Sequence, residues 1–218
     1  MLRNSLIATA ASLAVASFAS ATVYTGNGFT IPDNNPVGVS SDIVITDEFF
    51  VGDITVSLLG LIHTWAGDLT ATLTFIDMDN NSVSTTLFER IGRVNTGFGD
   101  SSDFGGTYSF NDSFNDANLP FGGNIWTAAA AVGAGLPIAP GNYFATGANS
   151  SAQVSLLAAF GGLNAKGTWR LTISDNAAGD LGSLSAWSLD FVKNPIPAPS
   201  ALALLGLAGL AGGRRRRA

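Results

Sequence analysis

Hydrophobic and polar residues alternate with a period of two in four segments of the chain: residues 54–62, 69–75, 169–174 and 187–191. Such alternation is typical of β-strands that bury one face. The pattern predicts that these side chains point inward: Ile54, Val56, Leu58, Ile62, Leu69, Ala71, Leu73, Phe75, Trp169, Leu171, Ile173, Trp187, Leu189 and Phe191. We expect the two tryptophans to anchor a core rather than to bind a ligand.

Turn-forming residues separate these segments, most clearly at residues 65–68, 77–81 and 176–182. Short strands between such turns indicate an all-β sandwich or barrel. Two alanine-rich segments, residues 128–134 and 152–159, are candidates for short helices. Since no internal repeat or linker interrupts the sequence, we expect one domain over residues 22–193.

The first 21 residues have the order of a secretory signal peptide. Arg3 gives the positive n-region, an apolar stretch follows, and the small residues Ala19-Ser20-Ala21 form a cleavage site. We therefore expect cleavage after Ala21 and a mature chain from Thr22. The alternative is a buried N-terminal helix.

The last part of the chain, residues 194–218, has the composition of a second targeting signal. A proline-rich entry leads into 13 apolar residues and then four arginines, and the residues of this signal are Pro197, Pro199, Arg214, Arg215, Arg216 and Arg217. Thirteen residues are fewer than the roughly 20 that span a bilayer, and the arginines would hold this end on the cytoplasmic side. The sequence thus predicts a short apolar anchor.

This tail resembles the PEP-CTERM sorting signal of Gram-negative bacteria, although the glutamate between the two prolines of that signal is Ala198 here. The resemblance implies transient anchoring in the inner membrane, processing by an exosortase, and delivery to the cell surface or extracellular matrix. The alternative is a plain C-terminal membrane anchor.

Composition excludes several classes of site. The chain has no cysteine and one histidine, His63, so disulfides, thiolate nucleophiles, Cys-based metal sites and multi-His sites are excluded. Residues 22–193 hold 5 basic against 16 acidic residues, a net charge of −11. Such a surface repels nucleic acid and favours divalent cations. We therefore expect no nucleic-acid partner.

Three turn aspartates, Asp68, Asp175 and Asp180, are candidate ligands for Ca²⁺. Calcium takes several oxygen ligands, and turns at the ends of a sheet supply both carboxylates and carbonyls. Two other interpretations stay open. Aspartates beside glycines often serve only as turn formers, and paired carboxylates also occur in glycosidases.

Aromatic residues are scattered through the glycine- and asparagine-rich stretch from about residue 100 to 147: Phe104, Tyr108, Phe110, Phe114, Phe121 and Trp126. Such residues usually attach long loops to the core. The alternative is a platform that binds an extracellular polysaccharide by stacking, for which Trp126 and Tyr108 are the candidates.

Two blocks of sequence, residues 61–75 and 160–191, resemble the P domain (P/Homo B domain) of subtilisin-like proprotein convertases. The second block contains Gly167-Thr168-Trp169-Arg170-Leu171-Thr172-Ile173-Ser174-Asp175 and Trp187-Ser188-Leu189-Asp190-Phe191. The resemblance extends over about residues 51–192. It implies a jelly-roll β-sandwich similar to galactose-binding domains. It also implies a domain that stabilises and modulates a neighbouring protease without holding a catalytic residue.

Catalysis is not expected of this chain. Residues 22–51 are too few for a protease domain, and a Ser/His/Asp triad would depend on His63, which we expect to be structural. No serine lies in a Gly-x-Ser-x-Gly pattern. We therefore predict a non-catalytic exported protein of the cell surface or extracellular matrix that serves in binding or structural support. The alternatives are an accessory domain for a separate subtilisin-like serine protease and a carbohydrate-binding module.

Overall fold

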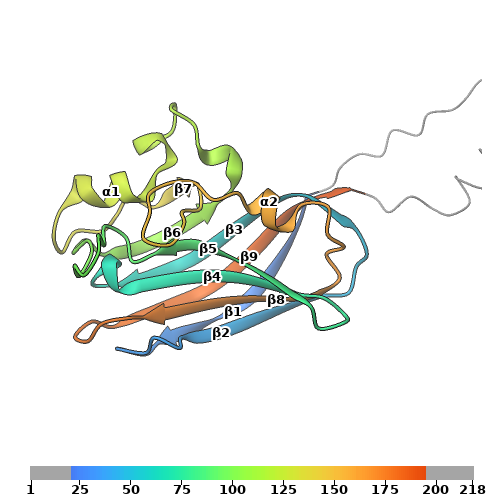
Figure 1. The fold of residues 1–218 in the computed structure, drawn as a ribbon, viewed down its shortest axis with the longest axis horizontal. Helices are drawn as coiled ribbons and strands as arrows, with labels where there is room; N and C mark the ends of the chain where they lie inside the picture. The colour runs from blue at the N-terminus through green and yellow to red at the C-terminus, as the bar shows by residue number, and fades with distance from the viewer. Residues whose placement is uncertain (1–20, 195–218) are drawn as a thin grey trace, which may run out of the picture.

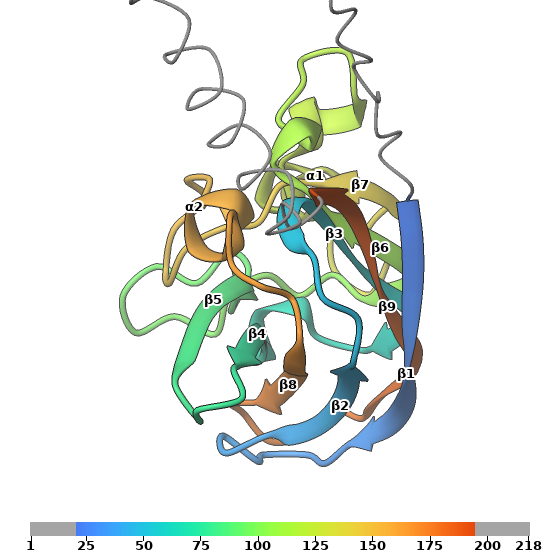
Figure 2. The same cartoon turned by 90° about the vertical axis from the view of Figure 1, so that its right-hand side faces the viewer.

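The computed structural model describes residues 21–194, so the predicted signal peptide before Ala21 and the predicted sorting signal after Asn194 lie outside the described residues. Two β-sheets pack face to face as a β-sandwich (Figures 1 and 2). The first sheet has the order β1 (Ala21–Ile31), β9 (Gly182–Asn194), β3 (Phe50–His63), β6 (Phe104–Phe110) and β7 (Gly141–Tyr143). The second has the order β2 (Val39–Ile45), β8 (Gly167–Asp175), β4 (Leu69–Ile76) and β5 (Ser82–Glu89). Neighbouring strands are antiparallel, except for β6 and β7.

The core between the sheets contains nearly all the side chains that alternation predicted to be inward. The inward residues of β4, β8 and the second half of β9 are buried, including both tryptophans. The Trp169 ring lies 4.7 Å from the Phe75 ring and 5.1 Å from each of the Phe160 and Phe191 rings, between centroids. Trp169 therefore joins β4, β8 and β9 in one aromatic cluster, as a core anchor should.

The prediction for Ile62 is wrong, because its side chain is 54% exposed. The pairing of β3 with β6 shifts by one residue between Leu58 and Leu61, and both of these leucines are buried. Gly60 lies inside this step with a φ of +62°. A bulge of this kind moves every later side chain to the opposite face, which a strict period of two cannot predict.

Helix α1 (Ile125–Val132) begins three residues before the predicted segment 128–134. Its N-cap is Asn124, whose side chain accepts a hydrogen bond from the Trp126 backbone N–H. It ends at Gly133, whose φ of +85° is unsuitable for continuing the helix.

Helix α2 (Leu156–Phe160) is shorter than the predicted segment 152–159 and begins later. Ser155 caps it, and the Asp112 carboxylate accepts hydrogen bonds from the backbone N–H groups of Leu156 and Leu157. This long-range cap sets the start of the helix. Within residues 21–194, no helix is long and apolar enough to cross a membrane.

The two ends of the described chain lie side by side at one end of the sandwich, at the upper right of Figure 1. There Ala21 of β1 pairs with Val192 of β9. At its other end, β9 begins with Gly182, which pairs with His63. Since β9 has 13 residues, these two ends of the sandwich are about 40 Å apart along the strand.

Candidate functional site

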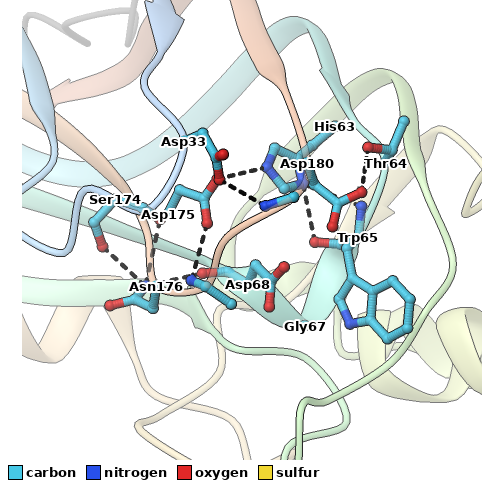
Figure 3. Close-up of polar contacts among 12 residues, drawn as sticks. Asp33, His63, Thr64, Trp65, Gly67, Asp68, Ser174, Asp175, Asn176 and Asp180 are labelled. Carbon is cyan, nitrogen blue, oxygen red and sulfur yellow. Dashed lines mark hydrogen bonds and ion pairs between the residues drawn. The ribbon is translucent and has the colours of Figure 1, made fainter.

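A buried histidine–carboxylate pair lies where β3 ends beside β8. His63 and Asp175 are fully buried, and His63 Nε2 lies 3.1 Å from Asp175 Oδ2 (Figure 3). The other ring nitrogen, Nδ1, lies 3.1 Å from the Trp65 backbone nitrogen. With a proton on Nε2, His63 donates to Asp175 and accepts from the Trp65 N–H. Both ring nitrogens thus have partners, which agrees with the structural role expected for His63.

A second buried carboxylate, Asp68, lies at the start of β4, at the end of a 3₁₀ turn, η1 (Ala66–Asp68). Its partner is Arg90, whose guanidinium donates to the Gly67 carbonyl at 2.9 Å and lies 3.5 Å from Asp68 Oδ1. The Oδ2 atom of Asp68 accepts no hydrogen bond from any residue between 21 and 194. Burial, and then the negative charge of Asp175, raise the pKa of Asp68 to about 6, against the opposing effect of Arg90.

Sequence reasoning missed Arg90, which lies just after β5. The only signal that could have found it is the register of the β4–β5 hairpin, in which Thr70 pairs with Glu89. That register places Arg90 opposite Asp68 and Leu69, and the Arg90 N–H donates to the Leu69 carbonyl at 2.8 Å.

The loop between β8 and β9 is held against this end of the sandwich by polar contacts (Figure 3). Asn176 donates to the Asp68 carbonyl from both its backbone N–H and its side-chain amide, at 2.9 Å each. The Thr64 hydroxyl donates to Asp180 Oδ1 at 2.6 Å, and the Gly179 N–H donates to Asp33 at 3.0 Å. The loop is thereby attached to β3, β4 and the segment after β1.

The three aspartates predicted as calcium ligands lie near one another but have different surroundings. Asp175 is engaged by His63 and by the Ala177 N–H, whereas Asp68 and Asp180 line the same pocket. Within residues 21–194, no three His, Cys, Asp or Glu side chains are grouped so that they could hold a metal ion. Calcium takes six to eight oxygens. The described side chains do not by themselves form such a site, so they fit the turn-former interpretation of these aspartates better.

The pocket has a volume of ≈ 500 Å³ and is lined by Trp65, Asp68, Phe98, Ala177, Ala178 and Asp180. The Trp65 indole N–H donates to the Phe98 carbonyl at 3.3 Å, which orients the indole ring. Phe98 is 73% exposed although it is a large apolar residue. The pocket combines aromatic faces with carboxylates, which suits binding. Within the described chain, no hydroxyl nucleophile is hydrogen-bonded to His63.

The proposed sugar platform does not include Tyr108. Tyr108 is fully buried, and its hydroxyl donates to the Ile138 carbonyl at 2.8 Å. Phe104 and Phe110 are buried beside it, because this part of the glycine- and asparagine-rich stretch forms strand β6, whose inward face carries all three rings. The structural interpretation is therefore right for these three aromatics, and Tyr108 as a sugar ligand is wrong. Trp126 packs partly buried against the core.

One family model matches part of the chain. Residues 143–191 match the family model of the proprotein convertase P-domain. This segment includes α2, β8 and most of β9, and so contains the second sequence block but not the first. No curated protein matches the chain.

Solved structures that are similar to this chain include two of a bacterial protease and one of a viral protein. The serine protease of Aeromonas sobria in complex with its chaperone has 16% identity and a TM-score of 0.41, over 81% of this chain and 28% of that one. The same protease alone has 16% identity and a TM-score of 0.36, over 80% and 27%. The VP2 subviral particle of infectious bursal disease virus has 10% identity and a TM-score of 0.34, over 79% and 33%. The chain thus spans a third or less of the length of each.

Proposed function

From the match of residues 143–191 to the proprotein convertase P-domain, we propose that this chain is a non-catalytic P-domain module that is exported and presents a binding surface at the cell surface or in the extracellular matrix. The strand order supports the jelly-roll fold of such a module. The order β1-β9-β3-β6 facing β2-β8-β4-β5 is that of an eight-stranded jelly roll, to which β7 adds one edge strand.

The polar groups at the end of β3 support a non-catalytic role. A catalytic histidine must reach the hydroxyl that it activates. His63 is fully buried, and its ring nitrogens are used by Asp175 and by the Trp65 backbone. The pair therefore serves to join β3 to β8.

The observation that carries the proposal is the placement of the pocket relative to the chain ends. The pocket lies beside His63, where β9 begins, and the described chain ends at Asn194, at the far end of the same strand. A tail anchored after Asn194 would hold the pocket about 40 Å from the attachment point. This geometry suits a surface protein that presents its binding site outward.

The experiment is surface display of the full chain in an exosortase-containing Gram-negative bacterium. We expect the wild type to reach the cell surface and a deletion of residues 196–218 to stay periplasmic with an unchanged thermal melt. A milder variant replaces Arg214 to Arg217 with glutamine and should lose display to a similar extent. Equal display of the deletion variant would overturn the sorting part of the proposal.

A second candidate is an accessory role for a separate subtilisin-like protease, which the P-domain match favours. Added to such a protease that lacks its own P domain, the purified chain should raise the protease's melting temperature. An unchanged melting temperature would argue against this role. Of the two aromatic residues proposed to stack on an extracellular polysaccharide, only Trp126 is still a candidate, since Tyr108 is buried.

A further inference from the structure

We propose that the pocket between Trp65 and Phe98 binds an arginine side chain presented by a partner protein. The inference rests on the proposed binding role and names the chemistry of the partner. The pocket lies at the end of the sandwich away from Asn194, where a partner can approach it.

The aromatic wall is the first reason. Phe98 is 73% exposed, and the Trp65 ring is held beside it by the indole hydrogen bond to the Phe98 carbonyl. A large apolar side chain left exposed beside a pocket is a common feature of binding sites. Aromatic faces attract cations, and tryptophan does so most strongly.

The carboxylates are the second reason. Asp68 is only 3% exposed, lines the pocket, and has one oxygen that accepts no hydrogen bond from residues 21–194. This oxygen is not among the enclosed side-chain atoms of residues 21–194 that lack a partner, so it is open to a donor that enters the pocket. A charged donor forms a stronger hydrogen bond with a carboxylate than a neutral donor does. Asp180, held by Thr64, adds a second negative group to the lining. Figure 3 shows both aspartates with the Trp65 ring beside them.

The combination favours guanidinium over other cations. A guanidinium is planar, so it can stack on an aromatic ring and donate hydrogen bonds to a carboxylate, whereas an ammonium is a compact and strongly hydrated charge. A pocket of ≈ 500 Å³ is of the size that holds small ligands, about 300–1,000 Å³. The net charge of −11 over residues 22–193 would also steer a basic partner toward the domain.

A second acidic pocket provides an internal control. It has a volume of ≈ 320 Å³, and its lining includes Glu48, Asp77, Asp79 and Lys166. There Lys166 already forms an ion pair with Glu48 at 2.8 Å. Negative charge is thus present in both pockets, but the lining of this one contains no tryptophan. We expect no arginine site there.

The test is an NMR titration of the purified full chain with the peptide acetyl-Gly-Arg-Gly-amide. We expect saturable shifts of the Trp65 indole signal with a Kd of about 1 mM, since a single side chain supplies little affinity. The same peptide with citrulline, a neutral group of the same shape, should bind at least tenfold more weakly. A lysine peptide should fall between the two.

Variants complete the test. Phe98→Ala removes an exposed side chain, so it should leave the fold intact and weaken binding by about threefold to tenfold. Asp68→Asn should weaken it at least tenfold. Asp79→Asn removes the same charge from the other pocket and should change nothing.

Three results would overturn the proposal: equal binding of the citrulline peptide, unchanged binding by the Phe98 variant, or calcium ions that saturate the same Trp65 signal and displace the peptide. The last result would assign the pocket to a metal. Because the experiment uses purified protein and a free peptide, a negative result leaves surface display and the lack of catalysis to their own tests.

Discussion

Asp68 shows how one residue balances burial against charge. Its carboxyl is almost fully buried, and the pKa of about 6 lies above the ordinary value of 3.8. The folded protein therefore holds this proton more tightly than the unfolded chain does. The contribution of Asp68 to stability is fully present below about pH 4 and is lost as the pH rises to 6, because the unfolded chain releases its proton first.

The Asp68→Asn variant tests this balance. Asparagine does not titrate, so the wild type should lose about 1–3 kcal/mol of unfolding free energy relative to the variant between pH 4 and pH 7. Urea denaturation at pH 4, 5, 6 and 7 measures the difference. The exposed variant Asp79→Asn should run parallel to the wild type, and a parallel course for Asp68→Asn would refute the assignment.

Whether calcium binds also depends on individual side chains. Because Asp175 is engaged by His63 and Arg90 lies beside Asp68, we expect the melting temperature of the full chain in 5 mM calcium to equal that in chelator within about 1 °C. The three aspartates then act as partners of neighbouring groups. A calcium-dependent rise that Asp180→Asn abolishes would establish the ion site that the sequence suggested.

At the scale of elements, alternation predicted the inward residues of β4, β8 and β9 because each strand there has an uninterrupted period of two. The same reasoning went wrong at Ile62, where β3 bulges around Gly60. A bulge depends on the neighbouring strands. The β3–β6 pairing shifts here while the β3–β9 pairing runs on unbroken, and on β9 the buried residues Trp187 and Leu184 are likewise three positions apart. Similarly, α2 begins where Asp112 caps it, and Asp112 is more than 40 residues away.

Gly60→Ala tests the bulge. At a φ of +62° any side chain is strained, and a Cβ there would lie 2.6 Å from Ser185 Oγ. Gly122→Ala is the matched control, because Gly122 has a φ of +61° with nothing within 4 Å of an added Cβ. We expect the control to cost about 1 kcal/mol and Gly60→Ala to cost about 1 kcal/mol more. Equal costs would mean that Ser185 moves aside freely.

At the scale of the whole molecule, the two ends of the described chain, Ala21 and Asn194, and the pocket lie at opposite ends of strand β9. This layout would separate the proposed attachment point from the proposed binding pocket. It also leaves His63 inside the structure, where it joins the two sheets.

The absence of proteolysis is a prediction about the whole molecule. The purified full chain should not hydrolyse casein or fluorogenic peptides above the buffer rate. His63 is buried, and its ring nitrogens are hydrogen-bonded to Asp175 and to the Trp65 backbone. His63→Ala should lower the melting temperature by several degrees, since it leaves the buried Oδ2 atom of Asp175 without its donor while only Oδ1 keeps the Ala177 N–H. Hydrolysis that disappears in this variant would contradict the non-catalytic assignment.

Local patterns were sufficient to predict the all-β class and the core tryptophans, because periodicity and turn chemistry depend on neighbours along the chain. The pocket could not be predicted in this way. Trp65 and Phe98 are 33 residues apart, and Thr64 and Asp180 are 116 residues apart. They meet only when the two sheets pack and the loops fold over their ends. Asp68 becomes buried, and its pKa is raised, only after that packing has excluded water.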